Sequence, residues 1–244
     1  MKKIVLISLF LFLISLHAQA RPPYTTDDPD VTAVGALETY IFFQFVNSTP
    51  AVTGIIPGLE VNYGLFDWLQ LHMIAPLSSY SDAGGIKAAG FGDLELGLKA
   101  RFLPESDIFP QAGIFPHVEL PTGDADRRLG SGKARVFIPL WLQKTWTNFS
   151  TYGGAGYWIE QAADRQNWWY AGWVLRLKID TGLLVGLELN YNTAQYKTGP
   201  PMNSANIGFE WDFAENQGIL LSYGMSMFGD ETYTGYLGYR LTLK

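Results

Sequence analysis

Few side chains in this sequence are of the types that carry out catalysis. The chain has three histidines and no cysteine, which excludes a thiol nucleophile and a cysteine-ligated metal. Neither His72 nor His117 is followed two residues later by serine, the arrangement that some membrane lipases and deacylases use. His117 and Glu119 would share one face of a strand, where the carboxylate could orient the imidazole. A histidine hydrogen-bonded to a neighbouring side chain is the simpler interpretation.

Two further patterns resemble ligand sites only in part. Asp124 and Asp126 are spaced like calcium ligands, but Arg127 and Arg128 follow where more oxygen ligands are needed, so we interpret this stretch as a solvated loop. Gly153–Gly156 lies within a strand pattern and no helix follows it, unlike a phosphate-binding loop. We therefore predict that the chain is not an enzyme and holds no metal or cofactor.

The N-terminus has the pattern of a secretory signal peptide. Lys2-Lys3 precedes an apolar run over residues 4–16, and Ala18-Gln19-Ala20 gives a small-x-small cleavage site. The run is too short to span a bilayer. We predict that residues 1–20 are removed on export and exclude them from the fold.

Composition narrows the class of protein. The net charge of −6 argues against a nucleic-acid partner, which requires a basic surface. Aromatic residues reach 15% while charged residues are only 16%, an unusual balance for a water-soluble domain. No apolar run of about 18 residues follows residue 20, so the sequence predicts no transmembrane helix. The apolar side chains must therefore be arranged with another period.

That period is two. Asp93–Phe102 reads Asp-Leu-Glu-Leu-Gly-Leu-Lys-Ala-Arg-Phe, which places the leucines on one face of a strand and the charged residues on the other. The same alternation recurs in Trp169–Asp180, Leu183–Tyr191 and Ala205–Phe213. About twelve strands of membrane-barrel length follow from these patterns. We place them near 35–46, 58–65, 68–76, 92–103, 109–120, 134–146, 148–158, 168–179, 182–192, 203–213, 217–227 and 231–243.

The connections alternate between tight turns and longer loops at 47–57, 77–91, 121–133 and 193–202. This is the pattern of outer-membrane barrels, whose short turns are periplasmic. The sequence thus predicts an all-β protein, a transmembrane antiparallel up-and-down β-barrel of about 12 strands, following a cleaved signal peptide. We divide the chain into a signal peptide (1–20), a periplasmic leader (21–34) and the barrel (35–244). Asp27, Asp28 and Asp30 are most simply part of a solvated leader, and the alternative is that this segment folds into the periplasmic mouth of the barrel.

Tryptophan positions favour this barrel over a secreted soluble β-sandwich. One group lies at strand ends beside short turns, and a second group lies beside the loop near 160–167. Two groups at opposite ends predict two aromatic girdles at the membrane–water interfaces. The first group comprises Trp68, Trp146 and Trp211, and the second Trp158, Trp168 and Trp169.

Two stretches resemble a known family. Arg21–Asp30, with the sequence Arg-Pro-Pro-Tyr-Thr-Thr-Asp-Asp-Pro-Asp, leads into Gly35–Thr39, and His117–Asp124 is followed by Leu129–Gly132. Both are similar to the MetA-pathway phenol-degradation family of outer-membrane proteins, described as transporters. The resemblance covers most of the chain after residue 20 in strand layout, but only these stretches in motif. It implies an outer-membrane barrel and uptake of hydrophobic aromatic compounds.

The end of the chain carries a second resemblance. Gly238–Leu243 is similar to the C-terminal signal that the outer-membrane barrel assembly machinery recognises, although the chain ends on Lys244 and not on an aromatic residue. We expect this machinery, outer-membrane lipid and lipopolysaccharide to be partners of the barrel, and a small-molecule solute to be its cargo.

The inward face of the barrel is where function is expected. Its acids and bases are comparable in number, which does not give the single-sign field of a strongly ion-selective pore. Inward aromatic rings at Tyr40, Phe42, Phe115, Phe137, Trp141 and Tyr170 could stack on a planar ligand or simply fill the lumen. The predicted lumen-lining residues are Glu38, Tyr40, Glu60, Glu95, Lys99, Arg101, His117, Glu119, Arg135, Arg176, Lys178, Glu188, Glu210 and Arg240.

About twelve strands place the barrel between a solidly packed eight-stranded barrel and an open porin of about sixteen strands. We therefore predict a channel that passes small, hydrophobic or aromatic molecules by passive diffusion through a narrow lumen. A sealed structural or adhesion barrel, and an outer-membrane lipid-modifying enzyme, remain the alternatives.

Overall fold

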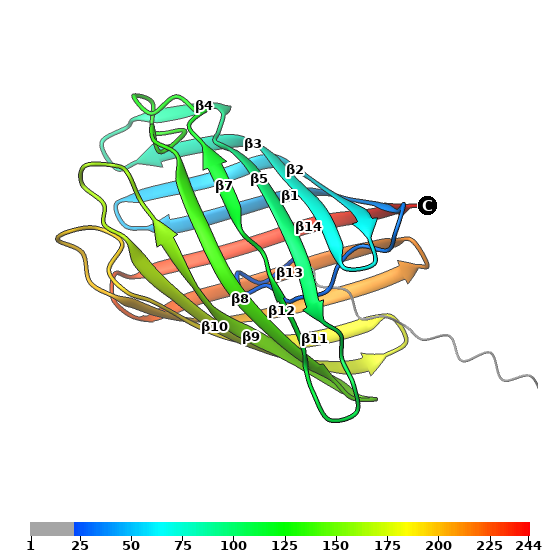
Figure 1. The fold of residues 1–244 in the computed structure, drawn as a ribbon. Helices are drawn as coiled ribbons and strands as arrows, with labels where there is room; N and C mark the ends of the chain where they lie inside the picture. The colour runs from blue at the N-terminus through cyan, green and yellow to red at the C-terminus, as the bar shows by residue number, and fades with distance from the viewer. Residues whose placement is uncertain (1–21) are drawn as a thin grey trace, which may run out of the picture.

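The computed structural model describes residues 22–244, so the predicted signal peptide lies outside the described residues. Fourteen β-strand segments form a single sheet that closes on itself, because β1 pairs with β14 (Figure 1). All neighbouring strands are antiparallel. No helix in this part of the chain has the length and apolar character needed to cross a membrane.

The strands follow one another around the barrel in chain order. Their bounds are β1 Leu37–Ser48, β2 Ala51–Phe66, β3 Leu69–Asp82, β4 Lys87–Phe91, β5 Leu94–Leu103, β6 Gln111–Ile114, β7 His117–Leu120, β8 Arg135–Thr145, β9 Phe149–Ile159, β10 Trp168–Asp180, β11 Leu183–Asn192, β12 Met202–Ala214, β13 Gln217–Phe228 and β14 Thr232–Leu243.

Two of the barrel strands are interrupted. β4 and β5 pair with successive parts of β3, and β6 and β7 both pair with β5 and with β8. Phe115-Pro116 separates β6 from β7, where the proline has no N–H to donate to the ladder. When β4 and β5 are counted as one strand, and β6 and β7 as another, the barrel has twelve strands. The predicted fold class is confirmed.

The predicted loops at 47–57 and 77–91 are largely wrong. β2 already begins at Ala51, directly after a tight turn, and β3 continues to Asp82. The hydrogen-bonded ladder extends these hairpins whatever side chains they carry, as in the pairs Asn47↔Val52 and Ala51↔Asp82. Above the membrane both faces of a strand can meet water, so the alternation that identified the other strands is lost there. The loops at 121–134 and 193–201 contain no strand.

The two faces of the wall differ as the alternation predicts. Leu96, Leu98, Leu175 and Leu187 point outward and are 39–51% exposed. On the same strand as Leu175, the neighbouring Val174 is fully buried inside. A closed sheet with an apolar outer surface satisfies every backbone group while presenting hydrocarbon to lipid. This is the architecture that a membrane requires of strands.

The N-terminal segment lies inside the barrel (Figure 1, blue). In the described part of this segment, residues 22–34, Thr26 is 2% exposed and Asp28 is completely buried. The prediction of a solvated leader is therefore wrong, and the alternative, a segment folded into the mouth of the barrel, is nearer to the structure. Its carboxylates and backbone amides bond to polar side chains of the lumen, which compensate for lost water. We call residues 22–34 the lumenal segment.

Candidate functional site

A cavity of about 410 Å³ lies inside the barrel. Pro22–Asp27 of the lumenal segment form part of its lining. The rest of the lining comes from inward side chains of the wall, and it divides into an aromatic part and a polar part. Cavities of this size are typical of sites for small molecules.

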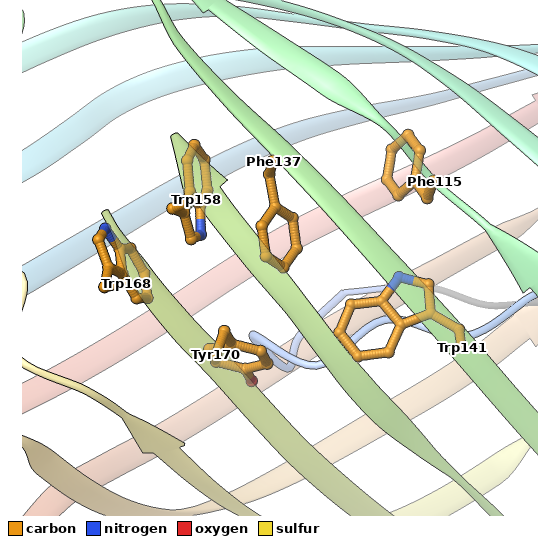
Figure 2. Close-up of a cluster of buried hydrophobic side chains, with 6 residues drawn as sticks. All are labelled: Phe115, Phe137, Trp141, Trp158, Trp168 and Tyr170. Atoms are coloured by element: carbon orange, nitrogen blue, oxygen red, sulfur yellow. The ribbon is translucent and has the colours of Figure 1, made fainter. Parts of the chain in front are cut away.

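The aromatic part is a cluster on one side of the wall (Figure 2). The ring centroids of Phe137 and Trp158 lie 4.8 Å apart and those of Trp158 and Trp168 lie 5.5 Å apart, both in stacked geometry. β8, β9 and β10 are adjacent, so their inward positions bring these rings together although the sequence separates them. The cluster consists of Phe115, Phe137, Trp141, Trp158, Trp168 and Tyr170, and all six border the cavity.

Two tryptophans that we assigned to the outer girdle belong to this cluster. Trp158 and Trp168 are 8% and 6% exposed and point into the lumen. Position near a strand end suggested a girdle, but strand parity decides the face: Trp168 is two residues from Tyr170, which also points inward. The four other girdle candidates, Trp68, Trp146, Trp169 and Trp211, are 46–55% exposed.

The polar part of the lining centres on His72 of β3. Its Nδ1 lies 2.7 Å from Asn62 Oδ1, and its Nε2 lies 3.0 Å from Glu95 Oε1. Glu60 accepts a hydrogen bond from Asn62 Nδ2 at 2.7 Å and lies 3.8 Å from His72. His117 Nε2 lies 4.0 Å from the second oxygen of Glu95. A connected group of carboxylates and imidazoles thus borders the cavity beside the aromatic rings.

The lumenal segment is attached to the wall by charged and polar contacts. Lys99 Nζ lies 2.8 Å from Asp27 Oδ1. The carboxylate of Asp30 accepts hydrogen bonds from Gln111 at 2.8 Å and Gln143 at 3.0 Å. These contacts narrow the lumen at the end where β1 begins.

Glu188 binds the same segment through its backbone. The N–H groups of Thr25 and Thr26 donate to the two oxygens of Glu188 at 3.3 and 2.6 Å, and Asn206 Nδ2 donates at 3.1 Å. Tyr170 Oη lies 3.3 Å from Glu188 Oε1. A fully buried carboxylate surrounded by donors holds the segment in one position.

Two glycines provide space for the segment's only aromatic ring. A Cβ on Gly186 would lie 2.2 Å from Tyr24 Oη, and a Cβ on Gly208 would lie 2.6 Å from the Tyr24 ring. Tyr24 therefore approaches the backbone of β11 and β12 more closely than any side chain there would allow. The wall is shaped to receive the lumenal segment.

The predicted lumen residues fall into three groups. Lys178 is exposed at the end of β10 and lies outside the lumen's interior. Glu60, Glu95, Lys99, His117 and Glu188 border the cavity. Inside the barrel but away from the cavity, buried or half-buried, are Glu38, Tyr40, Arg101, Glu119, Arg135, Arg176, Glu210 and Arg240.

Sequence reasoning missed the uncharged polar lining and His72. The lumen-lining prediction relied mainly on charged residues. Asn62, Gln70 and Asn206 alternate with apolar residues in the same way and are also buried. His72 lies two residues after Gln70 on the same strand, so the two side chains share a face, and this spacing could have placed His72 inside the barrel. Residues 22–244 contain no cluster of three or more side chains suited to hold a metal ion.

A second hollow of about 720 Å³ lies at the long-loop end of the barrel, opposite the end where β1 begins. It shares Asn192, Gln195 and Met202 with the central cavity, so these three residues lie where the two spaces meet. The loops at 160–167 and 193–201 are joined beside it, because the guanidinium of Arg165 lies 4.6 Å over the Tyr196 ring.

No protein-family model matches the sequence, and no curated protein matches it either. Solved structures do. The COG4313 outer membrane channel from Pseudomonas putida F1 is similar with a TM-score of 0.67 at 17% identity, covering 91% of this chain and 99% of that chain. The chain has the fold of an outer-membrane barrel.

Two further structures agree with this fold. The KdgM porin in complex with disordered oligogalacturonate has a TM-score of 0.58 at 9% identity, covering 84% of this chain and 99% of that chain. The translocator domain of the autotransporter NalP from Neisseria meningitidis has a TM-score of 0.51 at 11% identity, covering 86% of this chain and 89% of that chain. The shared architecture spans nearly all of the barrel.

Proposed function

We propose that this barrel is an outer-membrane channel for small hydrophobic or aromatic molecules, which cross by passive diffusion through a narrow lumen. The observation that carries the proposal is the cavity of about 410 Å³ with an aromatic cluster along one side. Apolar rings around a small cavity favour a planar apolar solute over a hydrated ion. The outer-membrane fold and the hollow at the long-loop end support a route that begins there.

The lumenal segment also favours a second candidate, a sealed structural barrel. Residues 22–34 extend between the cavity and the end of the lumen opposite the long loops, and their contacts with Glu188 and Lys99 hold them there. A sealed barrel would neither conduct nor take up solute. A channel with this segment in place would show a small conductance and measurable uptake.

Two adjacent tryptophans provide a matched test of the channel. Trp168 points into the cavity, whereas Trp169 points outward and is 55% exposed. We expect Trp168→Leu to reduce uptake of a labelled monoaromatic compound by Gram-negative cells about three- to tenfold, because it removes a stacking surface. Trp169→Leu should leave uptake unchanged. Equal uptake by both variants and the unmodified protein would count against the channel, and absence of any uptake or conductance would favour the sealed barrel.

A further inference from the structure

Charged side chains inside the barrel are sorted by position. Arg101, Arg176 and Arg240 do not border the cavity. Arg176 lies 3.4 Å from Glu210, and Arg240 lies 2.8 Å from Asp212. The cavity is bordered by carboxylates instead, and its single lysine, Lys99, is paired with Asp27. The balanced mixture predicted for the whole lumen therefore does not hold for the cavity.

The group around His72 carries an excess of negative charge. Asn62 Nδ2 donates to Glu60, which turns Asn62 Oδ1 toward His72 Nδ1. Since Glu95 Oε1 faces His72 Nε2, both ring nitrogens meet acceptor atoms and both must carry a proton. One imidazolium then serves two carboxylates, Glu60 and Glu95. His117 Nε2 lies 4.0 Å from Glu95, beyond hydrogen-bond distance, and its Nδ1 has no partner among the described residues, so we count this ring as neutral. On that count the two carboxylates leave one negative charge uncompensated within the group.

Two amide oxygens on the opposite side of the cavity accept no hydrogen bond within the described residues. Asn192 Oδ1 and Asn206 Oδ1 are buried and have no hydrogen-bond partner among the described residues. Both asparagines are 7% exposed and both border the cavity. The Nδ2 group of Asn206 is already used by Glu188 and Ser222.

The aromatic side of the cavity is also suited to positive charge. Ring faces attract cations. Two rings of the cluster already have a cation over one face: Arg135 lies 4.7 Å over Trp158, and Lys99 lies 4.9 Å over Phe115. Aromatic faces and carboxylates on the cavity wall therefore favour the same kind of ligand, a small molecule with a positive charge.

We infer that the cavity binds small aromatic or apolar molecules that carry a protonated amine, and that it rejects their carboxylate analogues. This inference rests on the proposed function and specifies the class of solute. The ammonium group would lie on the cavity side of the Glu60–His72–Glu95 group, and the ring would lie against the aromatic cluster around Trp158.

The test compares four ligands built on one benzene ring: benzylamine, benzyl alcohol, toluene and sodium benzoate. Each is titrated into the purified full barrel in detergent, and binding is followed by quenching of tryptophan fluorescence, since Trp141, Trp158 and Trp168 border the cavity. We expect benzylamine to bind about tenfold more tightly than benzyl alcohol, and benzoate to bind most weakly, because a charge-assisted contact is stronger than a neutral one.

The double variant Glu60→Gln/Glu95→Gln removes the negative charge and keeps the shape. It should lower the affinity for benzylamine about tenfold while changing that for benzyl alcohol less than about twofold. Glu215→Gln, a carboxylate exposed outside the lumen, is the matched control. Heat-dependent migration on a denaturing gel shows whether each variant is folded.

The four-ligand ranking uses the unmodified protein and decides the inference even where the double variant does not fold. Benzoate binding as tightly as benzylamine, or a benzylamine preference that the double variant keeps, would overturn the inference. In either case binding of benzyl alcohol and toluene would still support the proposed function. Binding of none of the four would overturn both.

Discussion

Lys99 Nζ and Asp27 Oδ1 lie 2.8 Å apart, across 72 residues of sequence. This ion pair joins the lumenal segment to β5. The lysine side chain is 5% exposed and the aspartate side chain 27% exposed. Loss of the ion pair would therefore cost more for the buried lysine than for the aspartate. An unpaired buried ammonium costs more than a carboxylate that can still reach water.

That asymmetry predicts unequal effects of removing each partner. Asp27→Asn should weaken docking of the lumenal segment by about 1–3 kcal/mol, because it leaves Lys99 buried without its counter-charge. Lys99→Met should weaken docking less. Protease cleavage within residues 22–34 and single-channel conductance in a planar bilayer would report the loosening. Equal weakening in both variants would contradict the asymmetry, and unchanged docking in both would show that the pair does not hold the segment.

Glu188 gives a second prediction for the same segment. Glutamine has the same shape as glutamate, but its amide NH₂ group would face N–H donors that contact a carboxylate oxygen in the unmodified protein. We expect Glu188→Gln to cost about 1–3 kcal/mol of docking and to raise conductance. Glu231→Gln, on the exposed loop before β14, is the control. A Glu188→Gln protein with unchanged protease resistance would contradict this role.

The neighbouring residue tests the outer face. Leu187 is 51% exposed on the outer wall, so Leu187→Arg should destabilise the folded barrel by about 2–4 kcal/mol if this position lies near the middle of the membrane. The measurement is reversible unfolding in lipid vesicles by urea. Leu187→Ala separates loss of the leucine from introduction of the charge. Arginine tolerated as well as alanine would mean that this face does not meet hydrocarbon.

Arg176 and Lys178 lie two residues apart on β10 and are a matched pair of cations. Arg176 is 1% exposed, contacts Glu210 and lies over the Tyr152 ring, whereas Lys178 is exposed. Arg176→Gln should lower stability by about 3–5 kcal/mol, because Glu210 loses a buried partner. It should also make single-channel currents irregular. Lys178→Gln should leave stability and single-channel currents unchanged. An effect of Lys178→Gln as large as that of Arg176→Gln would contradict the exposed position of Lys178.

Docking of the lumenal segment should depend on pH through Asp28, which belongs to no strand. Burial raises the pKa of Asp28 well above its usual value, and the charge of Asp30 raises that pKa further. The docked segment therefore binds a proton more tightly than the released one, so docking is favoured as the pH falls and weakens as it rises. Protection factors from hydrogen exchange of residues 22–34 at about pH 5 and pH 8, each relative to the intrinsic exchange rate at that pH, measure this. Asp28→Asn should reduce the difference, and larger protection factors at the higher pH would refute the sign.

Sequence alone determined the wall of this protein. Alternation such as that of Asp93–Phe102 is strict because one side of the strand meets lipid and the other the lumen, and a shift by one residue would reverse every side chain. The same parity identified the buried positions of Glu60, Glu188 and Arg176. Local chemistry was sufficient for these features, because each strand's two environments are fixed before its neighbours are known.

Tertiary structure alone decided the lumen's contents. Residues 22–34 read as a solvated leader because their polar composition shows no burial. They become buried only because partners from distant strands, such as Lys99 and Glu188, converge on them. Likewise Trp158 and Trp168 meet Phe137 only when β8, β9 and β10 lie side by side. Such contacts join residues across the closed barrel, and no local pattern records a partner that closure brings near.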